Sequence, residues 1–359
     1  MFKYIIKKLA YGILVIWGVV TLLFVIFNII PNDPARMILG QNTDSLSLAL
    51  VKQDLHLNEP IMKQYLSYLN DLSPISYHNT YNKKSIIYLD STKYQTYKTL
   101  LSGEKYKIIL KYPYLRRSYQ SKKRVSQIIS ETYFNTFVLA FSAISIASFL
   151  GILFGIISAI TKDSFLDKLI LIFSSLGMAL PSFFAAIIIG WLFAYLLHDF
   201  TGLNLTGNLY EIDDFGNGKT LVIKNLILPT LTLAIRPITV ITQLTRNSLL
   251  ETFSQDYIKT AYAKGMSFTK VLFKHALLNS LNPVITAISG WFASLLAGVV
   301  FVEYIFGWKG LGYVVVEALN NLDFPLVTGI VITISIIFVF VNILVDIFYV
   351  FLDPRIKFK

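Results

Sequence analysis

The chain has 359 residues, 55% of them hydrophobic, with a mean hydropathy of +0.60 and a formal net charge of +11. A soluble domain of this size would not be so apolar, and several apolar runs are long enough to cross a bilayer, so composition predicts a polytopic membrane protein. No cysteine is present, which excludes disulfides, thiol chemistry and thiolate metal sites. The four histidines include no pair at helical ligand spacing, so we expect neither a metal site nor a cofactor.

The first predicted span covers residues 9–30 and follows three lysines within the first eight residues. This run of 22 residues is longer than the apolar core of a signal peptide, and no small-residue cleavage site follows it. We therefore expect a transmembrane helix whose lysines stay in the cytoplasm. Pro31 and Pro34 would end it on the far side of the membrane.

Residues 35–130 contain no predicted span, and the stretch 77–124 differs in composition from the rest of the chain. It holds nine tyrosines and twelve Lys or Arg against two acidic residues, a net charge of +10. Because long loops translocate largely regardless of charge, we expect this stretch outside the membrane despite its basic character. Tyrosine clusters provide contact area and lysine clusters attract anionic surfaces. The stretch would therefore dock an acidic face of a partner protein or rest on an anionic outer leaflet; alternatively it is a solvated decoration without a partner.

Five further apolar blocks predict five more spans. One contains a Gly151-x-x-x-Gly155 pattern, which is typical of close helix packing, and the next contains Pro181, which predicts a kink. The predicted spans cover residues 134–160, 169–197, 226–244, 281–302 and 326–351. The N-terminus, the segment after the fourth span and the tail are net positive, whereas the loops 198–225 and 303–325 are net acidic, so both termini are expected in the cytoplasm.

A polar island at residues 255–283 separates the fourth and fifth spans, and it predicts two short helices joined at a glycine. Asp256 is a candidate N-cap, Gly265 occupies the place of a left-handed C-cap residue, and Ser267 is a candidate cap for the second helix. Such an elbow is too short to be a domain, but it has the size of a knob that another protein grips.

The elbow resembles the cytoplasmic coupling loop of permease subunits in binding-protein-dependent ABC importers, in the branch for dipeptides and oligopeptides, permease B type. In that branch the segment reads approximately D-Y-x-x-T-A-x-A-K-G. The matching residues here are Asp256, Tyr257, Thr260, Ala261, Ala263, Lys264 and Gly265. The broader importer consensus differs, because Lys259 and Thr260 stand where it has Glu and Ala, and Leu278 stands where it has Pro. Three further segments are similar to this branch: the P-x-D-P exit at 31–34, the segment 115–125 and the tail 353–357.

The resemblance implies an all-α polytopic membrane protein with the type I ABC importer transmembrane fold, about six transmembrane helices, and a multi-pass location in the bacterial inner, or cytoplasmic, membrane. It implies half of a translocation pathway for di- and oligopeptides. The implied partners are a homologous second permease, two ATP-binding subunits and an extracytoplasmic substrate-binding protein in a lipid bilayer, without nucleic acid. Tyr257, Ile258, Ala261 and Tyr262 would supply the apolar knob that the ATPase grips, and Gly265 would allow the sharp elbow.

This reading divides the chain into four parts. They are an N-terminal transmembrane helix at 1–33, an extracytoplasmic segment with the basic insertion at 34–130, a permease core at 131–352 and a cytoplasmic tail at 353–359. The insertion itself is placed at 77–114.

No enzymatic centre is predicted. Residues 216–220 resemble the end of a phosphate-binding loop, but Asp213 stands where that motif needs glycine, so we expect no ATP hydrolysis by this chain alone. Arg236 lies near the centre of a predicted span. It is a candidate pathway-lining residue for a peptide carboxylate, or else it snorkels or pairs with a neighbouring helix. Asn342 and Asp346, near the inner end of the last span, are expected to be packing partners.

Two other classes of protein compete with this interpretation. A self-sufficient secondary transporter or channel would need intramembrane ionisable residues or internal repeats. The sequence has few such ionisable residues and no internal repeat. An intramembrane enzyme would need a nucleophile and a base. Within the permease family, nickel chelates, opines or glycosides remain alternative substrates to peptides.

Overall fold

The computed structural model describes residues 2–29, 52, 57–82, 85–90, 92–94, 96–212 and 218–352. The predicted P-x-D-P exit and the C-terminal tail lie outside these residues. In the described part, five helical segments are long and apolar enough to cross a membrane, and a bent helix pair makes a sixth if it counts as one span. The five are α1 (Phe2–Ile29), α5 (Val125–Ile160), α9 (Lys224–Phe253), the run that contains α12 (Leu277–Gly298), and α15 (Phe324–Leu352). The predicted helical membrane fold is confirmed.

The bent pair corresponds to the predicted third span. Helix α6 (Phe165–Ala179) is followed by α7 (Ser182–Ile189) and the π-helical turn η1 (Gly190–Leu196). The second half is bent by 110° from the direction of α6. Leu180 is extended, with φ −76° and ψ 126°, because the ring of Pro181 disfavours the helical conformation for the residue before it. The proline therefore breaks this segment more sharply than the predicted kink.

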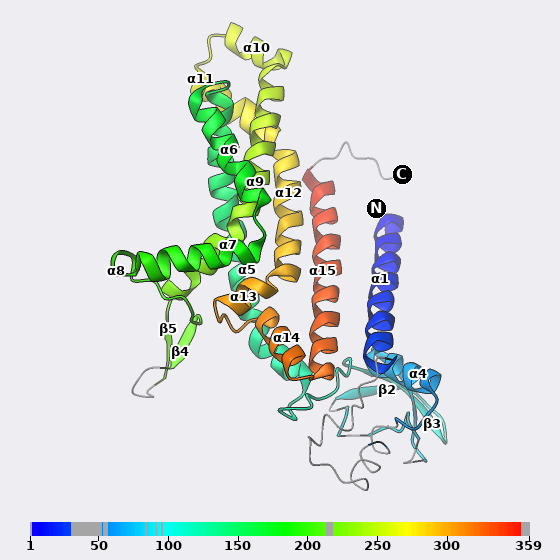
Figure 1. Ribbon diagram of the computed structural model, residues 1–359. Helices are drawn as coiled ribbons and strands as arrows, with labels where there is room; N and C mark the ends of the chain where they lie inside the picture. The colour runs from blue at the N-terminus through cyan, green and yellow to red at the C-terminus, as the bar shows by residue number, and fades with distance from the viewer. Residues whose placement is uncertain are drawn as a thin grey trace. The chain divides into compact units, whose positions relative to one another are not determined.

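The described chain forms two compact units, of which the first comprises Met1–Ile13, Thr132–Val316 and Ile334–Lys359. In this unit α9 packs against α6 and α12 (Figure 1). Gly151 and Gly155 of α5 lie directly on α9: a Cβ at Gly155 would be 2.5 Å from Cβ of Thr245, and one at Gly151 would be 2.7 Å from Cβ of Ile241. The predicted close-packing role of this glycine pair is confirmed.

Short elements lie at the end of α9 opposite the elbow (Figure 1). They are α8 (His198–Thr201), β4 (Tyr210–Ile212), β5 (Lys219–Leu221), α13 (Val300–Ile305) and α14 (Leu311–Asn320). Lys219 and Thr220 lie in strand β5, which pairs with β4 in antiparallel register. A phosphate-binding loop would place these residues at the start of a helix, so the geometry of this pair differs from that motif.

The second unit comprises Leu14–Glu131 and Glu317–Thr333, and it holds the basic insertion. The insertion forms an antiparallel sheet of order β1-β3-β2 beside helix α4 (Ile61–Leu72), although no strand was predicted there. The strands are β1 (Ile75–Asn79), β2 (Tyr97–Ser102) and β3 (Tyr106–Lys111).

Polar side chains hold this sheet to α4. Lys111 is buried and donates to the carbonyl oxygens of Asp71 at 2.6 Å and Ser73 at 3.1 Å, and burial lowers its pKa to about 8. The Tyr94 hydroxyl donates to the Asp71 carboxylate at 2.5 Å. The ammonium of Lys111 lies 4.8 Å from the centre of the Tyr94 ring. At least one lysine of the insertion is thus a structural residue and not part of its exposed charge.

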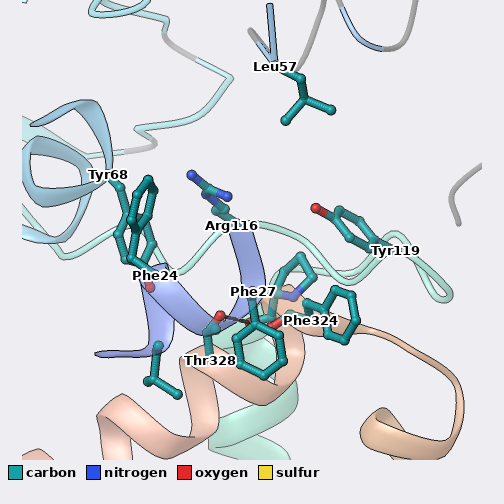
Figure 2. Close-up of a pocket in the computed structure, with 10 residues that line it drawn as sticks. Phe24, Phe27, Leu57, Tyr68, Arg116, Tyr119, Phe324 and Thr328 are labelled. Carbon is teal, nitrogen blue, oxygen red and sulfur yellow. Dashed lines mark hydrogen bonds between the residues drawn. The ribbon is translucent and has the colours of Figure 1, made fainter. Parts of the chain in front are cut away.

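The segment 115–125 is tied to the start of α15 within the second unit. Ser118 donates to the buried carboxylate of Asp323 at 2.5 Å, and the Tyr119 backbone N–H donates to it at 2.9 Å. Arg116 stacks on Tyr68 at 4.9 Å beside a cavity of about 40 Å³ whose other lining is largely aromatic (Figure 2).

Candidate functional site

The predicted elbow is present as helix α10 (Asp256–Ala263) after the end of α9 (Figure 1). The N-cap is Gln255, with extended φ −73° and ψ 147°, and Asp256 is already the first helical residue. The prediction of Asp256 as the N-cap was therefore one residue late. Asp256 instead pairs with Lys259 at 2.8 Å in the first turn, where a carboxylate suits the positive end of the helix dipole.

Gly265 ends the elbow helix in the left-handed conformation, with φ +76°, as predicted. The Gly265 N–H donates to Tyr262 O at 2.9 Å, and the Met266 N–H donates to Ala261 O at 3.3 Å. These two bonds make a Schellman motif, in which the residue after the C-cap takes positive φ. The motif provides hydrogen-bond donors for carbonyl groups of the last helical turn that have no partner within the helix. The motif reverses the chain within a few residues.

The second half of the elbow begins at Ser267, whose extended conformation makes it the N-cap as predicted, although its side chain forms no capping bond. The chain then runs through α11 (Phe268–Val271) and the π-helical turn η2 (Leu272–Ala276) into α12.

One face of α10 points into the protein's own core. Ile258 and Ala261 are only 1% and 7% exposed, and they belong to a cluster with Ala159, Leu249 and Val271. These two residues were expected to be part of the knob offered to a partner. The structure corrects that expectation, since their side chains anchor the elbow to α5 and α9.

The rest of the surface of α10 is open to a partner, and the two tyrosines lie on either side of the buried pair. Tyr257 and Tyr262 remain 43% and 42% exposed, and Thr260 and Lys264 lie on the exposed side with them. The Tyr257 hydroxyl accepts a hydrogen bond from the Asn279 side chain at 3.1 Å, which fixes the direction of its ring. The exposed side of the elbow helix is thus polar at its centre, with a tyrosine at each edge beside the buried pair.

Arg236 is exposed on α9, although most of this helix is buried. The neighbours Ala234, Pro237 and Thr239 are buried, so the arginine lies on a narrow open face. Within the described residues no ion pair or hydrogen bond is formed by its guanidinium. Asp346 instead pairs with Lys8 at 2.6 Å, which agrees with its predicted packing role. Asn342 donates to the Phe338 carbonyl of its own helix at 2.8 Å, and its packing role stays a prediction.

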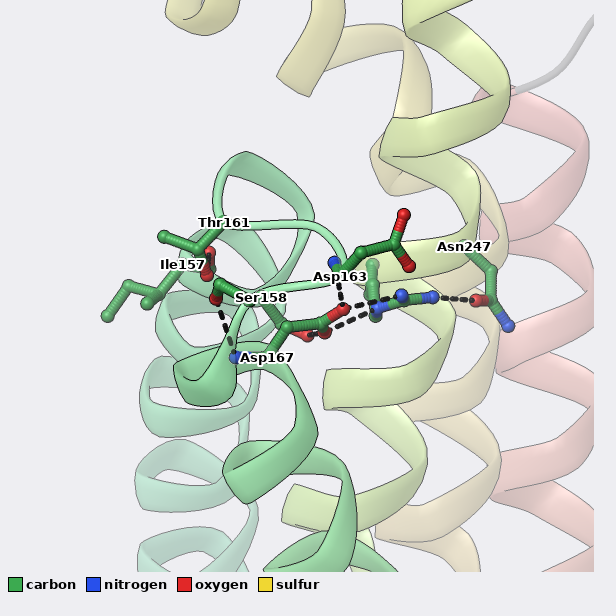
Figure 3. A network of polar contacts seen from close by, with 8 residues as sticks. Ile157, Ser158, Thr161, Asp163, Asp167 and Asn247 are labelled. Atoms are coloured by element: carbon green, nitrogen blue, oxygen red, sulfur yellow. Dashed lines mark hydrogen bonds and ion pairs between the residues drawn. The ribbon is translucent and has the colours of Figure 1, made fainter.

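Two buried carboxylates in the first unit were not singled out from the sequence. Asp167, in the first turn of α6, is held by Arg246 of α9 (Figure 3). Ser164 lies three residues before Asp167, and a serine followed at this spacing by an acidic residue is typical of a helix start. This pattern could have indicated Ser164 as the N-cap of α6. No comparable local pattern points to the second, Glu303.

Glu303 organises the turn between α13 and α14. Its carboxylate accepts from Thr136 of α5 at 2.7 Å and from the Gly312 and Tyr313 N–H groups at 2.7 Å and 3.2 Å, at the start of α14. Burial raises the pKa of Glu303 to about 7, although these three donors oppose the shift. The turn it holds is the glycine-rich segment 307–312.

The chain matches two family models. Residues 151–358 match the binding-protein-dependent transport system inner membrane component, and residues 1–85 match the N-terminal part of such a membrane component. The chain is 31% identical to the dipeptide transport system permease protein DppB of Alkalihalophilus pseudofirmus, with 100% of both chains covered. It is 32% identical to DppB of Bacillus subtilis, covering 99% of this chain and 98% of the relative. It is 28% identical to the glutathione transport system permease protein GsiC of Salmonella typhimurium, again over 100% of both.

A solved structure of similar fold is the inward-facing MetNI methionine ABC transporter. The similarity has a TM-score of 0.52 at 12% identity, and it covers 64% of this chain and 97% of the other. The fold is thus that of a type I ABC importer permease, and the family supplies membrane components rather than catalytic enzymes. The chain therefore belongs to the family of binding-protein-dependent transport system inner membrane components.

Proposed function

We propose that this chain is the permease subunit that forms half of the translocation pathway for di- and oligopeptides in an ATP-driven importer. The proposal is carried by the similarity to dipeptide permeases over the full length of the chain. The partners would be a homologous second permease, two ATP-binding subunits and the binding protein that the family description implies.

The elbow couples this pathway to ATP. An ATPase surface grips the exposed tyrosines of α10, while Ile258 and Ala261 hold the elbow against α5 and α9. When ATP closes the ATPase dimer, the elbow is displaced and the helices that carry it move with it. Support for this role comes from the exposure of both tyrosines of α10 beside a buried apolar pair that anchors the helix.

Arg236 faces the pathway and attracts the C-terminal carboxylate of the peptide. The proposal is supported by its exposure on an otherwise buried helix and by the absence of a counter-ion among the described residues. An unpaired arginine within a membrane span is costly unless it meets water, a partner or a ligand. The alternative is that the second permease supplies its partner.

Uptake into proteoliposomes that contain the complete importer tests the proposal. ATP-dependent accumulation of a labelled dipeptide is expected, and unlabelled dipeptide should compete for it, whereas a nickel chelate should not. Uptake of the nickel chelate without uptake of peptide would reject the peptide assignment while leaving the permease role intact.

Two Arg236 variants address the carboxylate contact. Arg236→Gln should raise KM for a dipeptide with a free C-terminus by about tenfold, the scale of a lost charge-assisted hydrogen bond, and leave KM for the corresponding C-terminal amide unchanged. Arg236→Lys, which keeps the charge, should give an intermediate KM. An equal rise of KM for the acid and for the amide would show that Arg236 does not bind the C-terminal carboxylate.

A further inference from the structure

The turn between α5 and α6 is joined to α9 by a buried ion pair of fixed geometry. Arg246 donates from Nε to Oδ1 of Asp167 and from Nη2 to Oδ2, both at 2.8 Å (Figure 3). Asp167 is 2% exposed. Two parallel charge-assisted bonds between planar groups fix the orientation as well as the distance of the two side chains.

The remaining acceptor positions of the carboxylate are also used. Ser158, in the last turns of α5, donates to Oδ1, and the Asp163 N–H donates to Oδ2 at 2.9 Å. Asp167 also donates its own N–H to the Ser164 cap at 3.2 Å. One carboxylate therefore binds α5, the turn, α6 and α9 together.

The same ends of α5 and α9 also hold the elbow. Ala159 of α5 and Leu249 of α9 pack with Ile258 and Ala261 of α10 in one apolar cluster. Arg246 is ten residues before the first residue of α10, on the helix that leads into it. The ion pair and the apolar cluster thus flank the same junction from two sides.

We propose that Asp167 and Arg246 are positioning residues for coupled transport, which make the turn between α5 and α6 follow the elbow as one rigid body. The proposal rests on the proposed function, in which the elbow receives the motion of the ATPase. Apolar side chains can slide past one another at small cost, whereas a slip of α6 along α9 would break both Arg246 bonds together. A buried ion pair is also a poor means of adding stability, since apolar residues of similar volume often serve as well.

The functional test uses the complete importer in proteoliposomes, with wild-type uptake established first. The double variant Asp167→Asn with Arg246→Met removes both charges, so neither is left buried alone. We expect thermal stability near that of the wild type, retained ATPase activity, and about tenfold fewer peptides imported per ATP hydrolysed, within the usual range of coupling between sites. Arg246→Lys, which keeps the positive charge but cannot form the two parallel hydrogen bonds, should give an intermediate number of peptides imported per ATP.

The partly exposed pair between Lys8 and Asp346 provides a matched control, because it also joins two helices of the first unit. The double variant Lys8→Gln with Asp346→Asn should leave the transport ratio unchanged. A wild-type ratio in the Asp167 and Arg246 double variant would overturn the proposal. So would a ratio that falls equally in the control. If the wild type itself imports no peptide, the proposed function fails first and independently.

A distance measurement tests rigidity without transport. The chain has no cysteine, so Lys162→Cys and Lys270→Cys place two spin labels at exposed positions on the turn and the elbow. With partner subunits free of reactive cysteine, the distance distribution should be narrow and equal with and without ATP. The double variant at 167 and 246 should broaden it. A wild-type distance that changes with ATP, or an unchanged distribution in the variant, would contradict the proposed joint.

Discussion

Gly265 shows how a single backbone angle can decide the shape of the coupling loop. Its φ is +76°, and a Cβ placed on it would meet no atom within 4 Å. Any cost of substitution therefore comes from the backbone conformation and not from a clash. For an ordinary residue the left-handed conformation costs roughly 1–2 kcal/mol, less for Asn and more for a β-branched side chain.

Gly265→Val should therefore uncouple ATP hydrolysis from peptide uptake while membrane insertion stays intact, and Gly265→Asn should be close to the wild type. Gly18 in α1 has equally open surroundings in a helical conformation, so Gly18→Val is a matched control. Uptake and the amount of inserted protein would both be measured. Wild-type uptake by Gly265→Val would exclude the elbow as the coupling site.

Glu303 predicts a pH dependence of stability whose sign follows from its raised pKa. The folded protein binds this proton more tightly than the unfolded chain does, with a pKa of about 7 against an ordinary carboxyl value of roughly 4.3. The stability from this group is therefore fully present below about pH 4.3 and is lost as the pH rises to 7. The difference amounts to about 4 kcal/mol.

Glu303→Gln should remove this dependence, because the amide resembles the protonated acid. Thermal unfolding of the purified chain between pH 4.5 and 7 should show the wild type losing stability relative to the variant as pH rises. Asp346→Asn, at an exposed ion pair, is the control for a generic loss of a carboxylate. A constant difference between wild type and Glu303→Gln across this range would refute the assignment.

At the scale of elements, the two faces of α10 predict two separable phenotypes. Tyr262→Ala on the exposed face should reduce binding-protein-stimulated ATPase activity of the importer with little change in thermal stability. Ile258→Ala on the buried face should destabilise the chain by about 2–5 kcal/mol, because it leaves a cavity in the cluster with Leu249 and Val271. A Tyr262→Ala variant that unfolds early but keeps full coupling would show that the faces are assigned the wrong way round.

The helices were predictable wherever one residue type dictates the backbone or the packing. Pro181 indicated a deviation in the third span, and Gly151 with Gly155 indicated close packing; both follow from local sterics. The angle of 110° after Pro181 was not predictable, since it depends on what the two halves pack against. Likewise, the carboxylate of Glu303 is satisfied by Thr136, which lies 167 residues away in the sequence.

The sheet of the insertion escaped prediction because its strands lack the usual alternation, and the pattern of β1 is inverted. Strand β1 turns Ser76 and His78 inward, while Ile75 and Tyr77 are exposed. A strand is predicted from apolar residues on its buried face, so β1 carries no usable signal. Strand β2 is exposed along its whole length, and the buried positions of β3 are divided between Ile109 and Lys111. Their cohesion comes from the contacts among Asp71, Tyr94 and Lys111, which join α4 to the sheet across about forty residues.

At the scale of the whole molecule, nearly all the net charge resides in the stretch 77–124, which includes the insertion and contributes +10 of +11. The outward face of the sheet combines that charge with apolar and aromatic side chains. Tyr77 stacks on Tyr106 at 4.9 Å between ring centres, and Leu101 and Leu110 are exposed near them. Tyrosine-centred surfaces with a charged rim are typical of protein interfaces. We therefore expect this face to dock the binding protein through an acidic surface.

Deleting residues 80–112 would remove two of the three strands, so surface substitutions are the cleaner test. Lys98→Gln with Lys105→Gln should weaken stimulation of ATPase activity by the binding protein at low salt and flatten its salt dependence, because exposed charges are screened over ~8–10 Å at physiological ionic strength. Lys122→Gln with Lys123→Gln removes the same charge away from the sheet and is the control. Equal effects of both pairs would exclude docking at the sheet face and favour a general attraction to the anionic leaflet. A reporter at the exposed Ser102 must also prove extracytoplasmic; a cytoplasmic signal there would reject both the docking and the six-span topology.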